Sequence, residues 1–403
     1  MVGAQREAGV QRACRRARER GPGRGRIGAR IGHPPSAERL HELFERPGRL
    51  TVGIEEELMV LDPETFDLAP RASELLEGLE ADPRFKPELV SGQVELVTTP
   101  SATVGDAAAQ LEEGRRTLVR AANGGLALAG AGAHPFTSET GVLNRAERYS
   151  HTRREYGWVA RRQLVFGLHV HVRVPGAQRA VAVYNGLRSY LPELAGLAAN
   201  APFYRGVDTG LASIRPKISE MLPRQGVPPA LTGLDDLAAA LAWGTRAGAL
   251  PGPRTWWWEL RLHPFHGTVE LRVPDQQTTV AETAAIAAVA HSLTAYLAAR
   301  HDAGERLRNH PTWRIEENRW SACRHGLEGT LADLDTGAPR PARERVQQVL
   351  SELERTAARL GCSKELAMAR ALTDATGAQR QRQIGSEGGA QEVARWLASR
   401  FRS

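Results

Sequence analysis

The chain has 403 residues, of which 41% are hydrophobic and 25% charged, a composition typical of a globular protein with a sizeable core. The net charge of +7 does not indicate a nucleic-acid-binding body, because residues 1–36 hold nine arginines and two glutamates and residues 37–403 sum to zero. The three cysteines lack zinc or redox spacing, and no run of about 18 apolar residues predicts a membrane span. We expect a cytoplasmic protein without nucleic-acid or membrane partners.

Residues 1–36 are expected to form a disordered, Arg-rich tail, since Gly and Pro interrupt them and no apolar face develops. They contain no apolar core of a secretory signal. A transit-like or nucleic-acid-binding arm stays open beside a solvated extension or an early start codon. Residues 37–403 are expected to form one domain.

The spacing of apolar residues and the turn residues between them predict a series of helices and strands. In chain order they are a helix capped by Ser36, strands 49–61 and 93–98, helix 105–123, strands 126–132 and 164–174, helix 178–200, a Gly/Pro-rich connection 205–233, strands 256–263 and 268–273, helix 280–300, and helices from 343 onward. Hairpin-linked strands with segregated helices indicate an α+β fold with a largely antiparallel sheet.

Four of these strands carry ionisable side chains on one face and apolar side chains on the other, because successive strand residues point to opposite faces. The pairs that share the ionisable face are Glu55 with Glu57, His169 with His171, and Glu270 with Arg272. So many charged groups on one sheet face are costly unless a cation joins them. Carboxylate-held Mg²⁺ usually accompanies a nucleotide phosphate, which points to ATP.

Each residue also has an ordinary structural explanation. Glu55 and Glu57 are favoured as metal ligands over solvated surface, whereas Glu56 shares the apolar face and needs a different partner, such as an arginine. Glu95 alone is as well explained by an ion pair. His169 and His171 could form a zinc pair or two hydrogen-bonded histidines, but the nearby carboxylates favour Mg²⁺ or Mn²⁺.

The predicted hairpin of strands 256–263 and 268–273 repeats a Glu-x-Arg pattern, with Glu259 before Arg261 and Glu270 before Arg272. Cross-strand ion pairing, with Glu259 as a partner for Arg272, is one explanation. The other places Glu270 on a metal and Arg272 on a phosphate or carboxylate.

The long connection contains Asp208 and Arg215, which either bind substrate or form turns. Residues 256–258 are three tryptophans expected mostly in the core, with one of them free to line a pocket. The sequence has no phosphate loop, no dinucleotide-binding glycine pattern and no nucleophile elbow.

A set of motifs in a fixed order carries a resemblance to a known family. They are Thr51-Val52-Gly53-Ile54-Glu55-Glu56-Glu57-Leu58, Gln93-Val94-Glu95-Leu96, Gly132-Ala133-His134-Pro135-Phe136, residues 161–172, Asn200-Ala201-Pro202-Phe203, residues 206–210, residues 267–273 and residues 324–329. From about residue 38 to its end, the chain resembles the bacterial carboxylate–amine ligase family, in its glutamate–cysteine ligase type 2 group.

This resemblance implies a curved antiparallel sheet with helices behind it, as in glutamine synthetase and the guanidino kinases. It implies an enzyme that uses ATP and Mg²⁺ or Mn²⁺ to form an amide through an acyl phosphate, with glutamate and cysteine as the expected small-molecule substrates. It leaves a homo-oligomer open. Carried over by motif, the metal set is Glu55, Glu57, Glu95, His169, His171 and Glu270, while Arg272, Arg215 and Asp208 contact the nucleotide or a carboxylate.

Residues 274–277 depart from the pattern of many relatives, which bears on the substrates joined. One alternative is a ligase of the same fold that joins another amino acid or amine. A less favoured alternative is a metal-dependent hydrolase that uses His169 and His171.

Overall fold

The computed structural model describes residues 34–250, 252 and 255–402. The expected tail lies outside these residues except for its last three positions, so its disorder stays a prediction. The first described helix, α2 (Ala37–Glu45), begins where the sequence predicts. Ser36 caps it by accepting a hydrogen bond from the backbone N–H of Arg39 at 3.3 Å.

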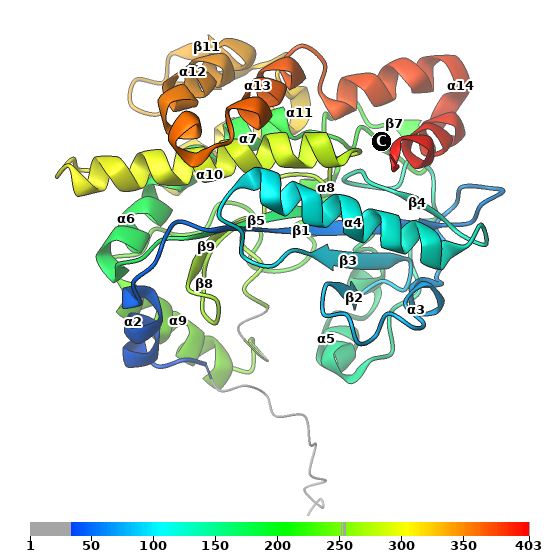
Figure 1. Cartoon of the computed structure of the whole chain (residues 1–403), viewed down its shortest axis with the longest axis horizontal. Helices are drawn as coiled ribbons and strands as arrows, with labels where there is room; N and C mark the ends of the chain where they lie inside the picture. The colour runs from blue at the N-terminus through cyan, green and yellow to red at the C-terminus, as the bar shows by residue number, and fades with distance from the viewer. Residues whose placement is uncertain (1–33, 251, 253–254, 403) are drawn as a thin grey trace, which may run out of the picture. The chain divides into compact units, whose positions relative to one another are not determined.

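An antiparallel sheet of seven strands forms the centre of the described domain, as Figure 1 shows. Its order is β2 (Phe85–Pro87), β3 (Gln93–Val97), β1 (Val52–Leu61), β5 (Leu168–Arg173), β9 (Thr268–Leu271) and β8 (Leu260–His263), and β4 (Ala127–Ala129) pairs with the end of β1. Two small ribbons lie apart from it: β6 (Phe203–Tyr204) with β7 (Val207–Asp208), and β10 (Thr330–Ala332) with β11 (Pro339–Pro341). The predicted α+β class with an antiparallel sheet is confirmed.

Helices α4 (Val104–Ala122) and α10 (Val280–Asp302) cover the apolar face of the sheet (Figure 1). The strand residues that alternate with the ionisable ones, such as Ile54, Val170 and Leu271, are buried beneath them. Helices α12 (Ala342–Leu360) and α13 (Ser363–Leu372) pack in turn on α10. The ionisable residues therefore occupy the opposite face of the sheet.

Helix α10 is a long hydrophobic helix in the middle of the domain. It begins with a capping box, in which Thr279 and Glu282 exchange side-chain and backbone hydrogen bonds. It is long and apolar enough to cross a membrane by length and composition, but 89% of that apolar window is buried inside the protein. It is a core helix between the sheet and the outer helices.

Some predicted elements differ from the structure. The expected helix 178–200 is two helices, α6 (Ala177–Arg188) and α7 (Leu191–Leu197), because Pro192 opens a new first turn, where its missing N–H costs nothing. The connection 205–233 contains the short helix α8 (Arg215–Ser219). Five helical elements of the described residues had no predicted counterpart: α3 (Ala72–Leu75), the 3-10 turn η1 (Glu147–Tyr149), α5 (Ser150–Arg161), α9 (Leu234–Arg246) and α11 (Thr312–His325). The short strands β2, β6, β7, β10 and β11 were not predicted either. The C-terminal helices are confirmed, and α14 (Gly377–Arg400) is kinked at Gly389.

Candidate functional site

The sheet register places the predicted residues in a row across five strands. Glu95 of β3 lies opposite Glu57 of β1, and Glu55 lies opposite His169 of β5. Further along, His171 lies opposite Glu270 of β9, which lies opposite Arg261 of β8. Residues directly opposite on one face of a sheet are close enough to interact. The row unites residues that are far apart in the sequence.

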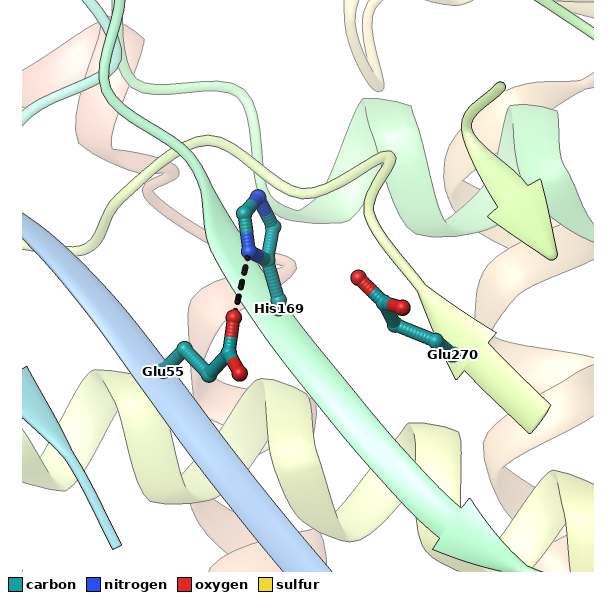
Figure 2. A group of neighbouring side chains, drawn as sticks. All are labelled: Glu55, His169 and Glu270. Atoms are coloured by element: carbon teal, nitrogen blue, oxygen red, sulfur yellow. Dashed lines mark hydrogen bonds and ion pairs between the residues drawn. The ribbon is translucent and has the colours of Figure 1, made fainter. Parts of the chain in front are cut away.

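Three side chains of this row gather at one point: Glu55, His169 and Glu270 each offer an atom within 4.8 Å of the others. Figure 2 shows them facing one another from β1, β5 and β9, and Oε2 of Glu55 lies 3.1 Å from Nδ1 of His169. The side chain of Glu270 is completely buried and that of His169 is 3% exposed. Carboxylate oxygens and a neutral imidazole are suitable ligands for a divalent cation.

His171 supports this group from the side. Its Nδ1 lies 2.9 Å from Oγ1 of Thr268, and its Nε2 lies 3.2 Å from Oε1 of Glu55. Burial acts to lower the pKa of His171, but the charges of Glu270 and Glu55 outweigh it and raise that pKa above its ordinary value. The two carboxylates therefore favour the cationic form of His171.

The two acidic groups of the cluster are held in their ionised form. Burial acts to raise the pKa of Glu55, but the charge of His171 and hydrogen bonds from both histidines hold it well below its ordinary value. For Glu270, burial is outweighed by Arg261, His171 and Arg272, which also keep its pKa well below the ordinary range. The cluster thus offers negative charge at neutral pH.

Glu57 and Glu95 lie beside this cluster. Glu57 accepts a hydrogen bond from the backbone N–H of Gly167 at 2.5 Å, and its other oxygen lies 3.7 Å from Nε2 of His169. Glu95 pairs with Nζ of Lys86 at 2.8 Å, which is the ion pair left open by the sequence. Two carboxylates directly opposite one another repel, so a cation between them would stabilise both.

The two arginines of the hairpin, Arg261 and Arg272, both form ion pairs with Glu270. Nε of Arg261 lies 2.5 Å from Oε2, and Nη1 of Arg272 lies 2.6 Å from Oε1. The alternative pairing of Arg272 with Glu259 is wrong, because Glu259 forms its ion pair with Arg319 at 2.5 Å. The arginine expected opposite Glu56 is Arg115, at 2.6 Å, on the buried face of the sheet.

Arg215 and Asp208 go to different places although both belong to the same connection. Arg215 starts α8 and donates to the carbonyl oxygens of Arg272 at 2.9 Å and Val273 at 3.1 Å, so it lies beside the hairpin end. Asp208 accepts from Arg382 at 2.8 Å and from the N–H of Gly210 at 2.8 Å. Asp208 does not line the cavity described next, so its predicted nucleotide contact is not supported.

A cavity of about 560 Å³ lies over the ionisable face of the sheet. Its lining includes the predicted residues Glu55, Glu57, Glu95, His169, Arg215 and Arg272. It also includes residues that the sequence reasoning missed or left unassigned: Lys86, Glu88, Arg148, Tyr149, Glu259, Arg261, His263 and His266. Of the three tryptophans, which are half-buried, Trp257 lines the cavity.

Glu88 is the most unusual of the missed residues. Burial, together with the charges of Glu95 and Glu57, raises the pKa of Glu88 well above its ordinary value. The hydroxyl of Tyr149 donates to it at 3.3 Å. It follows the short strand β2, which shows no alternating pattern, so no local signal in the sequence marked it.

Residues 51–395 match the family model described as glutamate–cysteine ligase family 2. The chain is 37% identical over 356 residues to "Putative glutamate--cysteine ligase 2-3" of Rubrobacter xylanophilus, covering 86% of this chain and 96% of that protein. It is also 37% identical over 357 residues to "Putative glutamate--cysteine ligase 2" of Gloeobacter violaceus, covering 85% of this chain and 94% of that protein.

Solved structures share the fold at low identity. The glutamate–cysteine ligase of Francisella tularensis, crystallised with AMP, superposes with a TM-score of 0.64 at 12% identity, covering 89% of this chain and 90% of that one. The bifunctional glutathione synthetase of Pasteurella multocida superposes with a TM-score of 0.61 at 14% identity, covering 91% of this chain and 53% of that one.

Proposed function

The chain belongs to glutamate–cysteine ligase family 2 and is an ATP-dependent ligase, and on this premise we propose that it joins an amino-acid carboxylate to an amine. The expected pair is the γ-carboxylate of glutamate and the amine of cysteine. The observation that carries the proposal is the row of carboxylates, imidazoles and guanidinium groups on one face of the sheet, open to a cavity of about 560 Å³.

The residues present fit a divalent metal ion. Glu55, His169 and Glu270 place three ligand atoms within 4.8 Å of one another, and Glu57 and Glu95 face each other beside them. These five would hold Mg²⁺ or Mn²⁺, with His171 as the partner of the Glu55 carboxylate. When bound, such an ion supplies positive charge that neutralises the transferring phosphoryl group.

The reaction that we propose has two steps. In the first, a carboxylate oxygen of the amino acid attacks the γ-phosphorus of ATP, ADP leaves, and an acyl phosphate forms. In the second, the amine nitrogen attacks the acyl carbon, phosphate leaves, and the amine loses a proton. Neither step needs a covalent intermediate with the protein, in keeping with the lack of a nucleophile-elbow motif.

The protein's own contribution is to align the reactants and balance their charge. Arg272 and Arg215 both line the cavity and are joined by a hydrogen bond from Arg215 to the carbonyl oxygen of Arg272. We assign them to oxygens of the phosphate or the acceptor carboxylate, which a guanidinium group grips with two parallel hydrogen bonds. The fixed hairpin keeps these donors in place before the substrates arrive.

A ligase of the same fold that joins a different amino acid or amine is the second candidate. The metal-dependent hydrolase is disfavoured by the family membership. A cytoplasmic location is part of the proposal. It agrees with the two described cysteines, Cys323 and Cys362, which are free and buried.

The test is phosphate release from ATP in the presence of Mg²⁺, screened against pairs of amino acids and amines. We expect release only with the cognate pair, together with an equal amount of amide product by mass spectrometry. Excess EDTA should stop turnover, and added Mg²⁺ or Mn²⁺ should restore it. Full turnover in EDTA, or amide formed without ATP, would contradict the proposal.

A further inference from the structure

A buried carboxylate, that of Asp275, lies next to Arg215 and does not line the cavity. Asp275, in the segment after β9, is 3% exposed. Its Oδ2 accepts from the backbone N–H of Asn200 at 2.7 Å, and its Oδ1 accepts from the hydroxyl of Ser213 at 3.0 Å. Oδ1 also lies 3.8 Å from Nη1 of Arg215. Asp275 thus ties the end of the sheet to the loop that carries Arg215.

Two glycines pack tightly against this pair. A Cβ at Gly132 would lie 2.5 Å from Cγ of Asp275, and a Cβ at Gly167 would lie 2.4 Å from Nη2 of Arg215. Neither glycine has a positive φ, so it is the lack of space for a side chain, and not the backbone conformation, that requires glycine at both positions. The backbone at Gly132 therefore lies close against Asp275, and the backbone at Gly167 lies close against Arg215.

We propose that Asp275 is a positioning residue, which fixes the Arg215 guanidinium at the cavity so that it can bind an oxygen of ATP or of the acceptor carboxylate. The proposal rests on the proposed function. The other partners of Arg215 are the carbonyl oxygens of Arg272 and Val273, which carry no charge. Asp275 supplies negative charge behind the guanidinium, and the cavity in front stays free for an anion.

The carboxylate is kept at a cost in stability. Burial raises the pKa of Asp275 to about 6, despite the opposing effects of Arg215, Asn200 and Ser213. Because the folded-state pKa lies above the ordinary value, protonation favours the folded chain, and stability falls as pH rises through about 6. A group that costs stability when ionised is better explained by ligand binding than by folding.

The titratable groups that face Asp275 are few. They are Arg215 from α8, Glu259 before β8 and Cys323 from α11. Burial raises the pKa of Cys323 to about 12, so this thiol stays protonated across the pH range of the test. Glu259 stays paired with Arg319 at 2.5 Å, so among these four groups Asp275 is the one expected to titrate near pH 6.

The test uses Asp275→Asn in the full chain, with Asp62→Asn as a matched control at an exposed turn where Asp62 accepts from the N–H of Thr65. At pH 8 we expect Asp275→Asn to melt at or above the wild-type temperature. Its KM for ATP or for the carboxylate substrate should rise by about 10- to 100-fold, the scale of a misplaced binding group. Relative to wild type, its fall in kcat/KM below pH 6 should be smaller, since Asp275 no longer contributes to it. Asp62→Asn should match wild type.

A second variant separates charge from position. Gly132→Ala keeps the carboxylate but displaces it, so we expect the same rise in KM with the acid limb of the pH profile retained. If this variant does not fold, Asp275→Asn decides alone. A wild-type KM in Asp275→Asn, or a rise in KM accompanied by a lower melting temperature, would overturn the positioning role.

Two calorimetric binding experiments keep this inference separate from the proposed function. One titrates the protein with a non-hydrolysable ATP analogue and Mg²⁺, and the other titrates it with glutamate, the expected carboxylate substrate. A wild-type protein that binds either ligand but makes no amide would refute the ligase proposal alone. Weaker binding by Asp275→Asn would then still support the positioning role. A wild-type protein that binds neither ligand would overturn both proposals.

Discussion

Glu55 and Glu56 are adjacent in the sequence but lie on opposite faces of β1, and this makes them a matched pair of test sites. Glu55 lines the cavity, where its side chain is 21% exposed. Glu56 is fully buried and pairs with Arg115 through contacts of 2.6 and 2.9 Å. The same substitution, Glu to Gln, should therefore have opposite consequences at the two positions.

We expect Glu55→Gln to lose activity and keep its fold. Removing one preorganised electrostatic group costs about 10²- to 10³-fold in kcat, or roughly 2.7 to 4 kcal/mol. Loss of an outer partner of a metal costs about 10- to 100-fold in affinity, so losing a direct ligand should weaken the apparent Mg²⁺ affinity at least about tenfold. Because Glu55 also pairs with the buried side chains of His169 and His171, the unfolding free energy should fall by about 1 to 3 kcal/mol, which is less than the loss expected at Glu56.

We expect Glu56→Gln to lose stability. The neutral amide leaves the Arg115 guanidinium, 3% exposed, without its counter-charge, and breaking one half of a buried ion pair costs about 3 to 5 kcal/mol. Urea unfolding at pH 7.5 gives the unfolding free energy of both variants, and an Mg²⁺ titration of phosphate release gives their activity. A wild-type rate for Glu55→Gln at limiting Mg²⁺ would remove Glu55 from the metal site, and equal stability of the two variants would refute the role of Arg115.

Three further outcomes can be checked with the same assays. Glu270→Gln should abolish turnover and also lower the unfolding free energy by about 3 to 5 kcal/mol, because both Arg261 and Arg272 lose their shared partner; a stable, inactive variant would show that the ion pairs contribute little. Arg272→Lys should lower kcat by about 10²-fold with little change in Mg²⁺ dependence, since lysine keeps the charge but loses the two-pronged donor; an unchanged kcat would remove Arg272 from the reaction. Asp208→Ala should leave the KM for ATP unchanged, because Asp208 pairs with Arg382 away from the cavity; a raised KM would restore the nucleotide contact inferred from the motif.

The sequence alone determined which side chains share a face. In a strand the side chains alternate with a period of two residues, which is a local property that no distant contact can change. This is why the sequence separates Glu55 from Glu56 and predicts an arginine partner for Glu56, which in the structure is Arg115. The order of the motifs likewise sufficed to indicate the family.

Only the tertiary structure decided which faces meet and which charges pair. Glu55 and His169 are 114 residues apart, and the register of β1 with β5 sets them opposite one another. Strand pairing depends on contacts across the whole domain, so local patterns could not show that Arg261 shares Glu270 with Arg272. Asp208 and Arg215 are close in sequence, and the motifs predicted that both contact the nucleotide or a carboxylate. In the structure only Arg215, which begins α8, lines the cavity.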